Sequence, residues 1–209
     1  MELAGVEIAA PDAAAYEMLL GIAPVPRAGG GWRFALERGT VDLVPGDGRL
    51  RALRFVGDAA GADDFHGLPV KIGPPDGTSA GATGVAIDHV VVRTPDADRA
   101  IRLWRDRVGL RLALDRAFPE RGLRLVFFRS GGMTLELATG HPAAEPLDGP
   151  DVLHGVSYRV ADLAGRRERL LAAGVDVSPI RVGMRPGTSV ATVRSGTSGV
   201  PTLLLQVDS

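Results

Sequence analysis

The chain has 209 residues, and its 24 basic and 25 acidic side chains give a formal net charge of −1. A balance so close to neutral argues against binding nucleic acid or an anionic membrane through bulk charge. The absence of cysteine excludes disulfide scaffolds, thiolate zinc sites and cysteine nucleophiles. No apolar run approaches the ~20 residues that cross a bilayer, and the start of the chain lacks a signal-peptide pattern, so we expect a cytoplasmic protein without nucleic-acid or membrane partners.

The N-terminal part predicts a faint strand-and-helix unit. Residues 5–21 (GVEIAAPDAAAYEMLLG) read as a strand, an Asp that precedes a helix, and a closing Gly, with short strands following at Trp32–Leu36 and Thr40–Val44. A second copy begins at Leu50 and shrinks to LPVKIG. Gly, Pro and Ser dominate the next residues and predict a linker at 76–84.

Two complete copies follow. DHVVVRTPDADRAIRLWRDRVG (88–109) and HGVSYRVADLAGRRERLLAAG (154–174) each read as strand, capping Asp (Asp96, Asp162), amphipathic helix and Gly. Strand-like runs follow each helix, at 110–114, 123–128 and 133–138 in the first copy and at 175–182, 189–193 and 202–207 in the second. This pattern predicts an α+β protein with a reduced N-terminal domain (1–75), the linker, and a C-terminal domain (85–209) of two βαβββ modules.

This order resembles the vicinal oxygen chelate superfamily of glyoxalases, bleomycin-resistance proteins, extradiol dioxygenases and methylmalonyl-CoA epimerases. The phrases that carry the resemblance are IDHVVVRTPDADRAIRLW, GGMTLELATG and HGVSYRVADLAGRRERLLAAGV, within Ile87–Val207. The resemblance implies that the modules pair into one incompletely closed, barrel-like sheet. It also implies that the cavity of this sheet holds a divalent metal and a small oxygenated ligand.

In this family the metal ligands are a His or Gln early in the first strand of a module and a Glu on its last strand. The matching residues here are His89 and Glu136. Strand alternation predicts that His89 shares a face with Ile87 and Val91, and Glu136 with Thr134. Imidazole and carboxylate suit Zn, Fe, Mn or Ni.

The predicted ligand set is incomplete. The last module has Gly155 where the second His or Gln would fall and Leu204 where the Glu would fall, and His154 is one residue out of register. The earlier copies offer Arg51 at the strand-start position and Asp42 near the acidic one. We therefore favour a protein without a metal cofactor over one with a metal held by His89 and Glu136.

Without a metal, His89 and Glu136 could serve as acid and base for an enolisable substrate, or the histidine could be a satisfied core residue. Candidate substrate-binding residues near them are Ser157, Arg159, Phe127 and Arg194. For the arginines the competing interpretation is solvated surface, and for Phe127 it is core packing.

The sequence thus predicts a glyoxalase-like protein that acts on or binds a small oxygenated organic molecule. As an enzyme it would perform lyase, isomerase or dioxygenase chemistry. The alternative is a metal-free binding protein like the bleomycin-resistance relatives, and a third is a structural or regulatory remnant of the family. The exposed edges of an incompletely closed sheet also favour a homodimer.

Overall fold

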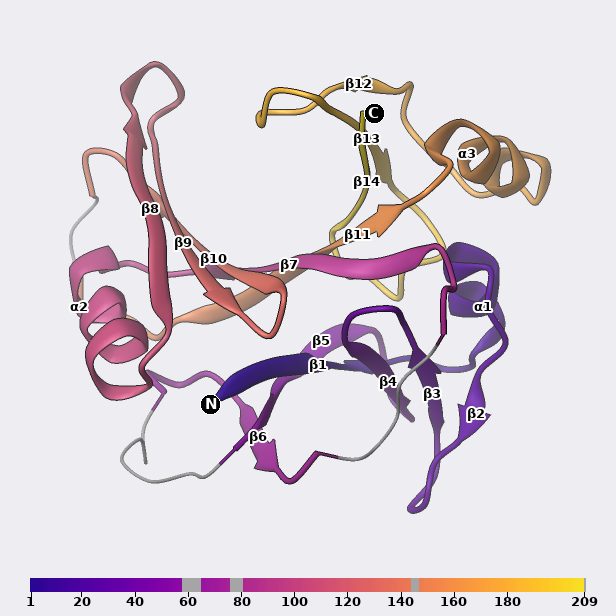
Figure 1. Cartoon of the computed structure of the whole chain (residues 1–209), viewed down its shortest axis with the longest axis horizontal. Helices are drawn as coiled ribbons and strands as arrows, with labels where there is room; N and C mark the ends of the chain where they lie inside the picture. Colours follow the sequence, from indigo (N-terminus) through magenta and orange to yellow (C-terminus); the bar gives the residue numbers. More distant parts are fainter. Residues whose placement is uncertain (58–64, 76–80, 144–146, 209) are drawn as a thin grey trace.

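The structure is a computed structural model that describes residues 1–57, 65–75, 81–143 and 147–208. Within these ranges the chain forms two sheets that share one hydrophobic core (Figure 1). The N-terminal sheet runs in the order β2 (Val25–Pro26), β3 (Trp32–Ala35), β4 (Thr40–Val44), β1 (Glu2–Ala9), β5 (Arg49–Val56) and β6 (Val70–Gly73). The predicted linker falls partly on residues 76–80, which lie outside the described ranges.

The C-terminal sheet runs in the order β12 (Arg181–Val182), β13 (Thr188–Val193), β14 (Thr202–Val207), β11 (Val152–Val160), β7 (Val85–Arg93), β10 (Met133–Gly140), β9 (Leu123–Ser130) and β8 (Arg111–Phe118). This sheet curves into a trough, with β7 and β11 at its floor, β8–β10 in one wall and β12–β14 in the other (Figure 1). The N-terminal sheet lies beneath that floor. The trough is therefore the concave surface on which a site can form.

Strand pairing confirms the predicted modules. β7 pairs in parallel with β10 and antiparallel with β11, and β1 pairs in the same way with β4 and β5. β6 runs parallel to β5 as β14 runs parallel to β11, so the reduced copy keeps the first and last strands of a module. Each sheet has edge strands at both ends and stays open. The α+β fold of paired βαβββ modules with a reduced N-terminal copy was predicted correctly.

The helices begin and end where the sequence indicates. They are α1 (Ala14–Leu20), α2 (Ala97–Ile101), which continues into a π-helical segment (Arg102–Arg107), and α3 (Leu163–Ala172), with a short 3₁₀ turn at Pro119–Arg121. Asp96 and Asp162 cap α2 and α3 by accepting hydrogen bonds from the backbone N–H of Arg99 (2.9 Å) and Gly165 (2.8 Å). α1 ends at Gly21, whose φ of 66° is a left-handed conformation that glycine adopts without strain.

Aromatic packing joins the two sheets. Trp104, on the π-helical segment, is fully buried and stacks on Phe55 of β5 with ring centroids 5.7 Å apart. Tyr16 of α1 donates a hydrogen bond to the backbone oxygen of Thr197, near β14 (3.0 Å). Large buried aromatic side chains stabilise such contacts through the area they remove from water. The sheets therefore hold each other in place.

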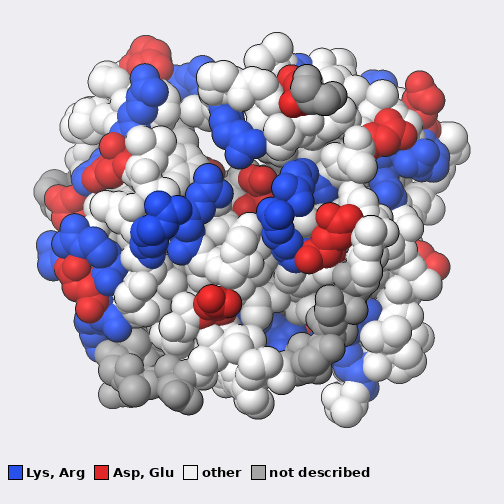
Figure 2. Space-filling model, in the orientation of Figure 1, with Lys and Arg blue, Asp and Glu red and all other residues white. Residues whose placement is uncertain are grey.

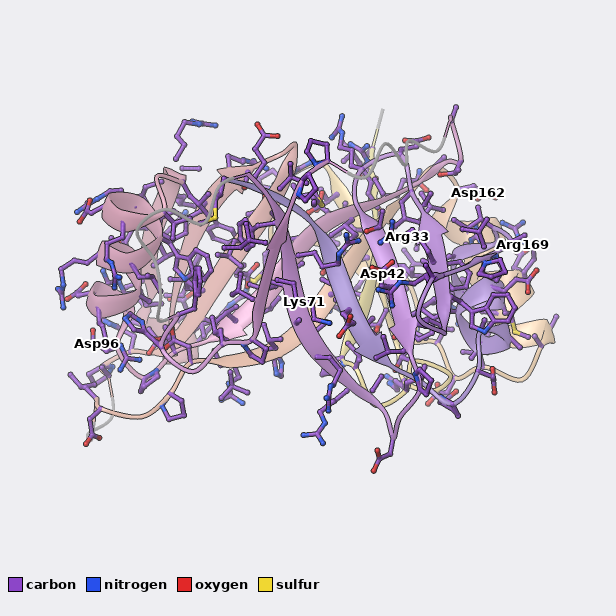
Figure 3. The ribbon with its side chains drawn as sticks, turned by 90° about the horizontal axis from the view of Figure 1, so that it is seen from below. Arg33, Asp42, Lys71, Asp96, Asp162 and Arg169 are labelled. Carbon is purple, nitrogen blue, oxygen red and sulfur yellow. The ribbon has the colours of Figure 1, made fainter. Side chains whose placement is uncertain are left out.

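Ion pairs occupy the face of the N-terminal sheet that points away from the core residues Val6, Ile8, Val41 and Leu43. Asp42 of β4 has no exposed side-chain surface (0%) and pairs with Arg33 (2.6 Å) and Arg54 (2.8 Å), while Lys71 of β6 pairs with Glu7 of β1 (2.6 Å). Figure 3 shows Arg33 and Asp42 together and Lys71 further along the same sheet. Asp42 lies opposite Glu7 in the parallel pairing, and at the corresponding register position of the C-terminal sheet stands Glu136 opposite Val91. Asp42 therefore occupies the same register position in its sheet as Glu136 does in the C-terminal sheet, as predicted. Its carboxylate is, however, already paired with Arg33 and Arg54.

No helix among the described residues is long and apolar enough to cross a membrane.

Replacing Asp42 by Asn should destabilise the protein by roughly 3 kcal/mol, because the partly buried guanidinium groups of Arg33 and Arg54 lose a fully buried countercharge. Chemical denaturation followed by circular dichroism measures this change. Asp176→Asn is the matched control, since Asp176 pairs with Arg194 (3.3 Å) on the surface and should change stability by less than about 0.5 kcal/mol. Equal losses in the free energy of unfolding for the two substitutions would show that the network around Asp42 stabilises the fold no more than a surface ion pair does.

Candidate functional site

A cavity of about 280 Å³ opens in the trough of the C-terminal sheet. Its lining comes from both walls and from the floor: Asp88, His89, Leu125, Phe127, Arg129, Thr134, Glu136, Arg181, Met184, Arg185, Thr188, Val190, Leu203 and Leu205. Figure 2 shows basic side chains gathered on both sides of a hollow in the upper half of the molecule, with acidic atoms between them. Apolar walls with a few convergent polar groups are typical of small-molecule sites.

A β-bulge in β7 shapes the floor of the cavity. His89 pairs opposite Ser157 of β11, but the next pair joins Ile87 to Tyr158, so Asp88 is an extra residue. A bulge of this kind places two consecutive side chains on one face. Asp88 and His89 both line the cavity, whereas Ile87 is buried in the core. The expectation that Ile87 and His89 share a face was wrong for this reason.

Asp88, His89 and Ser157 form a hydrogen-bonded chain. His89 Nδ1 lies 2.9 Å from Asp88 Oδ2, and His89 Nε2 lies 2.7 Å from Ser157 Oγ. An ionised carboxylate only accepts hydrogen bonds, so Nδ1 donates to Asp88, and in the tautomer with the proton on Nδ1 alone Nε2 accepts a hydrogen bond from the Ser157 hydroxyl. Ser157 is only 3% exposed and does not line the cavity, which suits a group that orients the imidazole rather than one that attacks a substrate.

Asp88 is held in its ionised form. Burial by itself would raise the pKa of Asp88, but the hydrogen bond and positive charge of His89, together with the charges of Arg185 and Arg159, outweigh burial and leave that pKa below its ordinary value. The fixed negative charge of Asp88 beside Nδ1 keeps the proton on that nitrogen and so favours one tautomer of the ring. Asp88 is thus a site residue that strict strand alternation assigns to the opposite face.

Glu136 faces the same cavity from β10. One of its carboxylate oxygens, Oε2, lies 3.6 Å from His89 Nε2, and its side chain is 14% exposed. Burial raises the pKa of Glu136 and the charge of Asp88 adds to this, while the charge of His89 opposes it. Two carboxyl groups in one cavity thus have pKa values shifted in opposite directions, an arrangement found where acid and base roles are divided.

Three arginines that the sequence analysis did not single out line the cavity. They are Arg129 on β9, Arg181 on β12 and Arg185 in the turn after β12. Arg129 donates a hydrogen bond to Thr134 Oγ1 (2.7 Å), and within the described ranges none of the three forms an ion pair with a carboxylate. Alternation from Phe127 along β9 would have identified Arg129, but only the fold brings β12 across from the other wall.

The remaining predicted substrate residues divide into two groups. Phe127 lines the cavity, whereas its neighbour Phe128 is buried in the core. Arg159 lies outside the lining, 4.0 Å from Glu37, although its charge still lowers the pKa of Asp88. Arg194 also lies outside the cavity and pairs with Asp176 at the surface. The structure therefore brings together His89, Glu136, Ser157 and Phe127, and leaves the two arginines at a distance.

The donor set does not fit a chelated divalent metal. A Cβ on Gly155 would lie 2.5 Å from the backbone oxygen of Pro201, so no imidazole or amide side chain fits there without a backbone shift. The position predicted for Leu204 was one residue off, since Leu203 pairs opposite Ser157 and lines the cavity while Leu204 is buried in the core. Across the described ranges, no group of at least three His, Asp or Glu side chains is placed to hold a metal ion.

His154 does occupy a bulge, since the pairing of β11 with β7 shifts between Leu153 and Gly155. This bulge does not rescue a metal site, because His154 lines a different pocket from His89 and Glu136. Burial, aided by the charge of Arg93, lowers the pKa of His154.

The chain belongs to the Glyoxalase/Bleomycin resistance protein/Dioxygenase superfamily, whose model matches residues 88–192. It is 27% identical over 99 residues to an ethylmalonyl-CoA/methylmalonyl-CoA epimerase from Cereibacter sphaeroides, covering 44% of this chain and 72% of that one. Methylmalonyl-CoA epimerase from Mycobacterium tuberculosis is structurally similar over 61% of this chain and 89% of its own (20% identity, TM-score 0.50). A variant of 4-hydroxymandelate synthase from Streptomyces coelicolor covers 100% of this chain and 93% of its own (14% identity, TM-score 0.72), so the arrangement of both sheets is shared.

The raised pKa of Glu136 predicts a pH-dependent stability. The folded state holds this proton to higher pH than the unfolded state does, so the contribution of Glu136 to the free energy of unfolding falls as pH rises through its folded pKa. Glu136→Gln removes the charge, and the variant should gain stability relative to wild type as the pH rises above the ordinary glutamate pKa of about 4.3. Urea titrations at several pH values measure this difference. The exposed Glu168→Gln is the control, and a flat difference for Glu136→Gln would contradict the assignment.

Proposed function

We propose that this protein transfers a proton at a carbon next to a carbonyl group of a small anionic molecule, as in an isomerase or lyase, without a chelated metal. The observation that carries the proposal is the largely buried Glu136 carboxyl, which lies beside the oriented His89 in a cavity that three arginines also line. A desolvated carboxylate is a stronger base than one in water, and proton abstraction needs a base poised near the working pH. The name of the epimerase relative supports this class of reaction, since epimerisation at such a carbon moves one proton.

Glu136 is the group that would accept the proton from the substrate carbon. His89 Nε2 lies 3.6 Å from Glu136 Oε2. Once Glu136 is protonated, the proton can therefore be shared between these two atoms. Asp88 holds the imidazole through Nδ1 and stabilises it when Nε2 is protonated as well. The negative charge that develops on the substrate carbonyl oxygen is favoured by the positive side chains around the cavity.

The charges of the lining define the substrate class. Arg129, Arg181 and Arg185 exceed Asp88 and Glu136 by one positive charge while His89 is neutral. Arginine suits carboxylate and phosphate groups because its planar fork can donate two parallel hydrogen bonds. The cavity volume of about 280 Å³ accommodates the reacting part of a small molecule, and a longer ligand would extend past the rim. We infer a substrate with a carbonyl group and at least one carboxylate or phosphate.

The second candidate is binding without catalysis. It is favoured by the apolar wall of Phe127, Leu125, Leu203 and Leu205, which a metal-free binding protein could use to hold a ligand. Ring-cleaving oxygenase chemistry would need a metal that the donor set described above does not fit. The proposed site draws all its residues from one chain and does not need a partner subunit. The homodimer and the cytoplasmic location remain predictions of the sequence analysis.

Proton exchange with solvent tests the catalytic proposal directly. The protein is incubated in deuterium oxide with a panel of anions that carry an acidic C–H, such as 2-oxo acids and malonic half-thioesters, and loss of the C–H signal is followed by NMR. Wild type should accelerate exchange of at least one compound, and Glu136→Gln should slow that exchange about 100-fold or more. Glu168→Gln is the control and should exchange at the wild-type rate.

Either of two results would overturn the proposal. Exchange that proceeds equally fast in Glu136→Gln would remove Glu136 from the chemistry. Ligand binding without any exchange, with an affinity unchanged in Glu136→Gln and His89→Ala but reduced in Phe127→Ala, would establish the binding protein instead.

A further inference from the structure

A larger pocket, of about 870 Å³, lies where the N-terminal sheet meets the beginning of β11. This junction pocket is lined by Glu7, Arg49, Leu50, Arg51, Ala52, Gly67, Pro69, Val70, Lys71, Pro150, Asp151, Val152, Leu153, His154, Gly199, Val200 and Pro201. It shares no lining residue with the cavity around Glu136. Its volume falls within the range of about 300–1,000 Å³ that small-molecule sites occupy.

Two bulges point into the junction pocket from different sheets. In β5, Leu50 pairs with Ile8 and Ala52 pairs with Glu7, so Arg51 is the extra residue, as His154 is in β11. Both bulge residues line the pocket. The sequence analysis placed Arg51 at the position equivalent to His89, but the pairing gives that position to Ala52. Bulges commonly redirect side chains at functional sites.

The pocket carries an excess of available positive charge. Arg49 and Arg51 are exposed, and neither forms an ion pair with any carboxylate in the part of the chain that the structure describes. Lys71 is tethered to Glu7 (2.6 Å) but keeps 58% of its side chain exposed. The acidic Asp151 is fully buried and already paired with Arg99 (2.8 Å), so it does not neutralise the two arginines.

The rest of the lining is apolar or proline-rich, with Leu50 and Val70 on one side and Leu153 and Val200 on the other. Unpaired cations beside an apolar surface match a ligand that has an anionic group and an organic body. We propose that the junction pocket is a second binding site, which takes a small organic anion bearing phosphate or carboxylate through Arg49, Arg51 and Lys71. The proposal does not depend on the reaction proposed for Glu136.

Titration calorimetry with pyrophosphate and with citrate tests this site and separates its two ligand chemistries. The tighter of the two probes identifies the anionic group that the pocket prefers. The double variant Arg49→Gln/Arg51→Gln should weaken binding of that probe at least about 10-fold, since it removes two charge-assisted contacts. All six positions changed in the three double variants of this experiment are exposed, and thermal melting checks that each double variant is folded.

Two controls locate the binding. Arg102→Gln/Arg111→Gln removes the same charge from other parts of the surface and should leave the affinity unchanged. Arg181→Gln/Arg185→Gln changes the cavity around Glu136 and should also leave the junction-pocket affinity unchanged. The proposal is overturned if wild type binds neither probe, if Arg49→Gln/Arg51→Gln binds as tightly as wild type, or if only Arg181→Gln/Arg185→Gln loses binding.

Discussion

The candidate site depends on one extra residue in β7. Without the bulge at Asp88, strand alternation would turn the carboxylate to the core face of β7, and His89 would keep Ser157 and Glu136 near Nε2 but lose its partner at Nδ1. With it, two consecutive side chains face the trough, and an ionised carboxylate fixes the imidazole beside Glu136. The bulge sacrifices regular strand pairing at one point, and bulges of this kind are typical of strands that redirect a side chain toward a site.

The two sheets show how one topology supports different chemistry. In the N-terminal sheet the acidic position is occupied by Asp42, which pairs with Arg33 and Arg54 and has no exposed side-chain surface. In the C-terminal sheet the neighbour of the Glu136 carboxylate is His89, with which it can share a proton. Among the described residues, no arginine or lysine forms an ion pair with Glu136. The first arrangement uses the carboxylate in a buried ion-pair network, and the second is the one on which the proposed proton transfer rests, so the same fold can serve different ends.

The sequence predicted the repeated order of strand, capping Asp, helix and Gly, because each of these signals is local. His89 and Glu136 were expected in the same cavity because the resemblance to the superfamily assigns both positions to its ligand site, and strand alternation agrees for Glu136 on β10. Prediction from the sequence failed where the pairing is irregular. Bulges put Asp88 in the cavity and gave the position predicted for Arg51 to Ala52. The residue opposite Ser157 on the last strand is Leu203, one before the predicted Leu204. Arg181 and Arg185 could not be recognised among 24 basic residues, since their role follows from the wall that β12 joins. No local pattern contains that information.

The central claim is that the trough holds Glu136 in a desolvated state suited to proton transfer. Carbon-13 NMR of the glutamate carboxyl groups across a pH titration measures this directly, with the Glu136 signal assigned by its absence in Glu136→Gln. The account predicts that Glu136 titrates above the ordinary glutamate value of about 4.3. A Glu136 signal that titrates at or below the ordinary value would show a solvated carboxylate and would contradict the account.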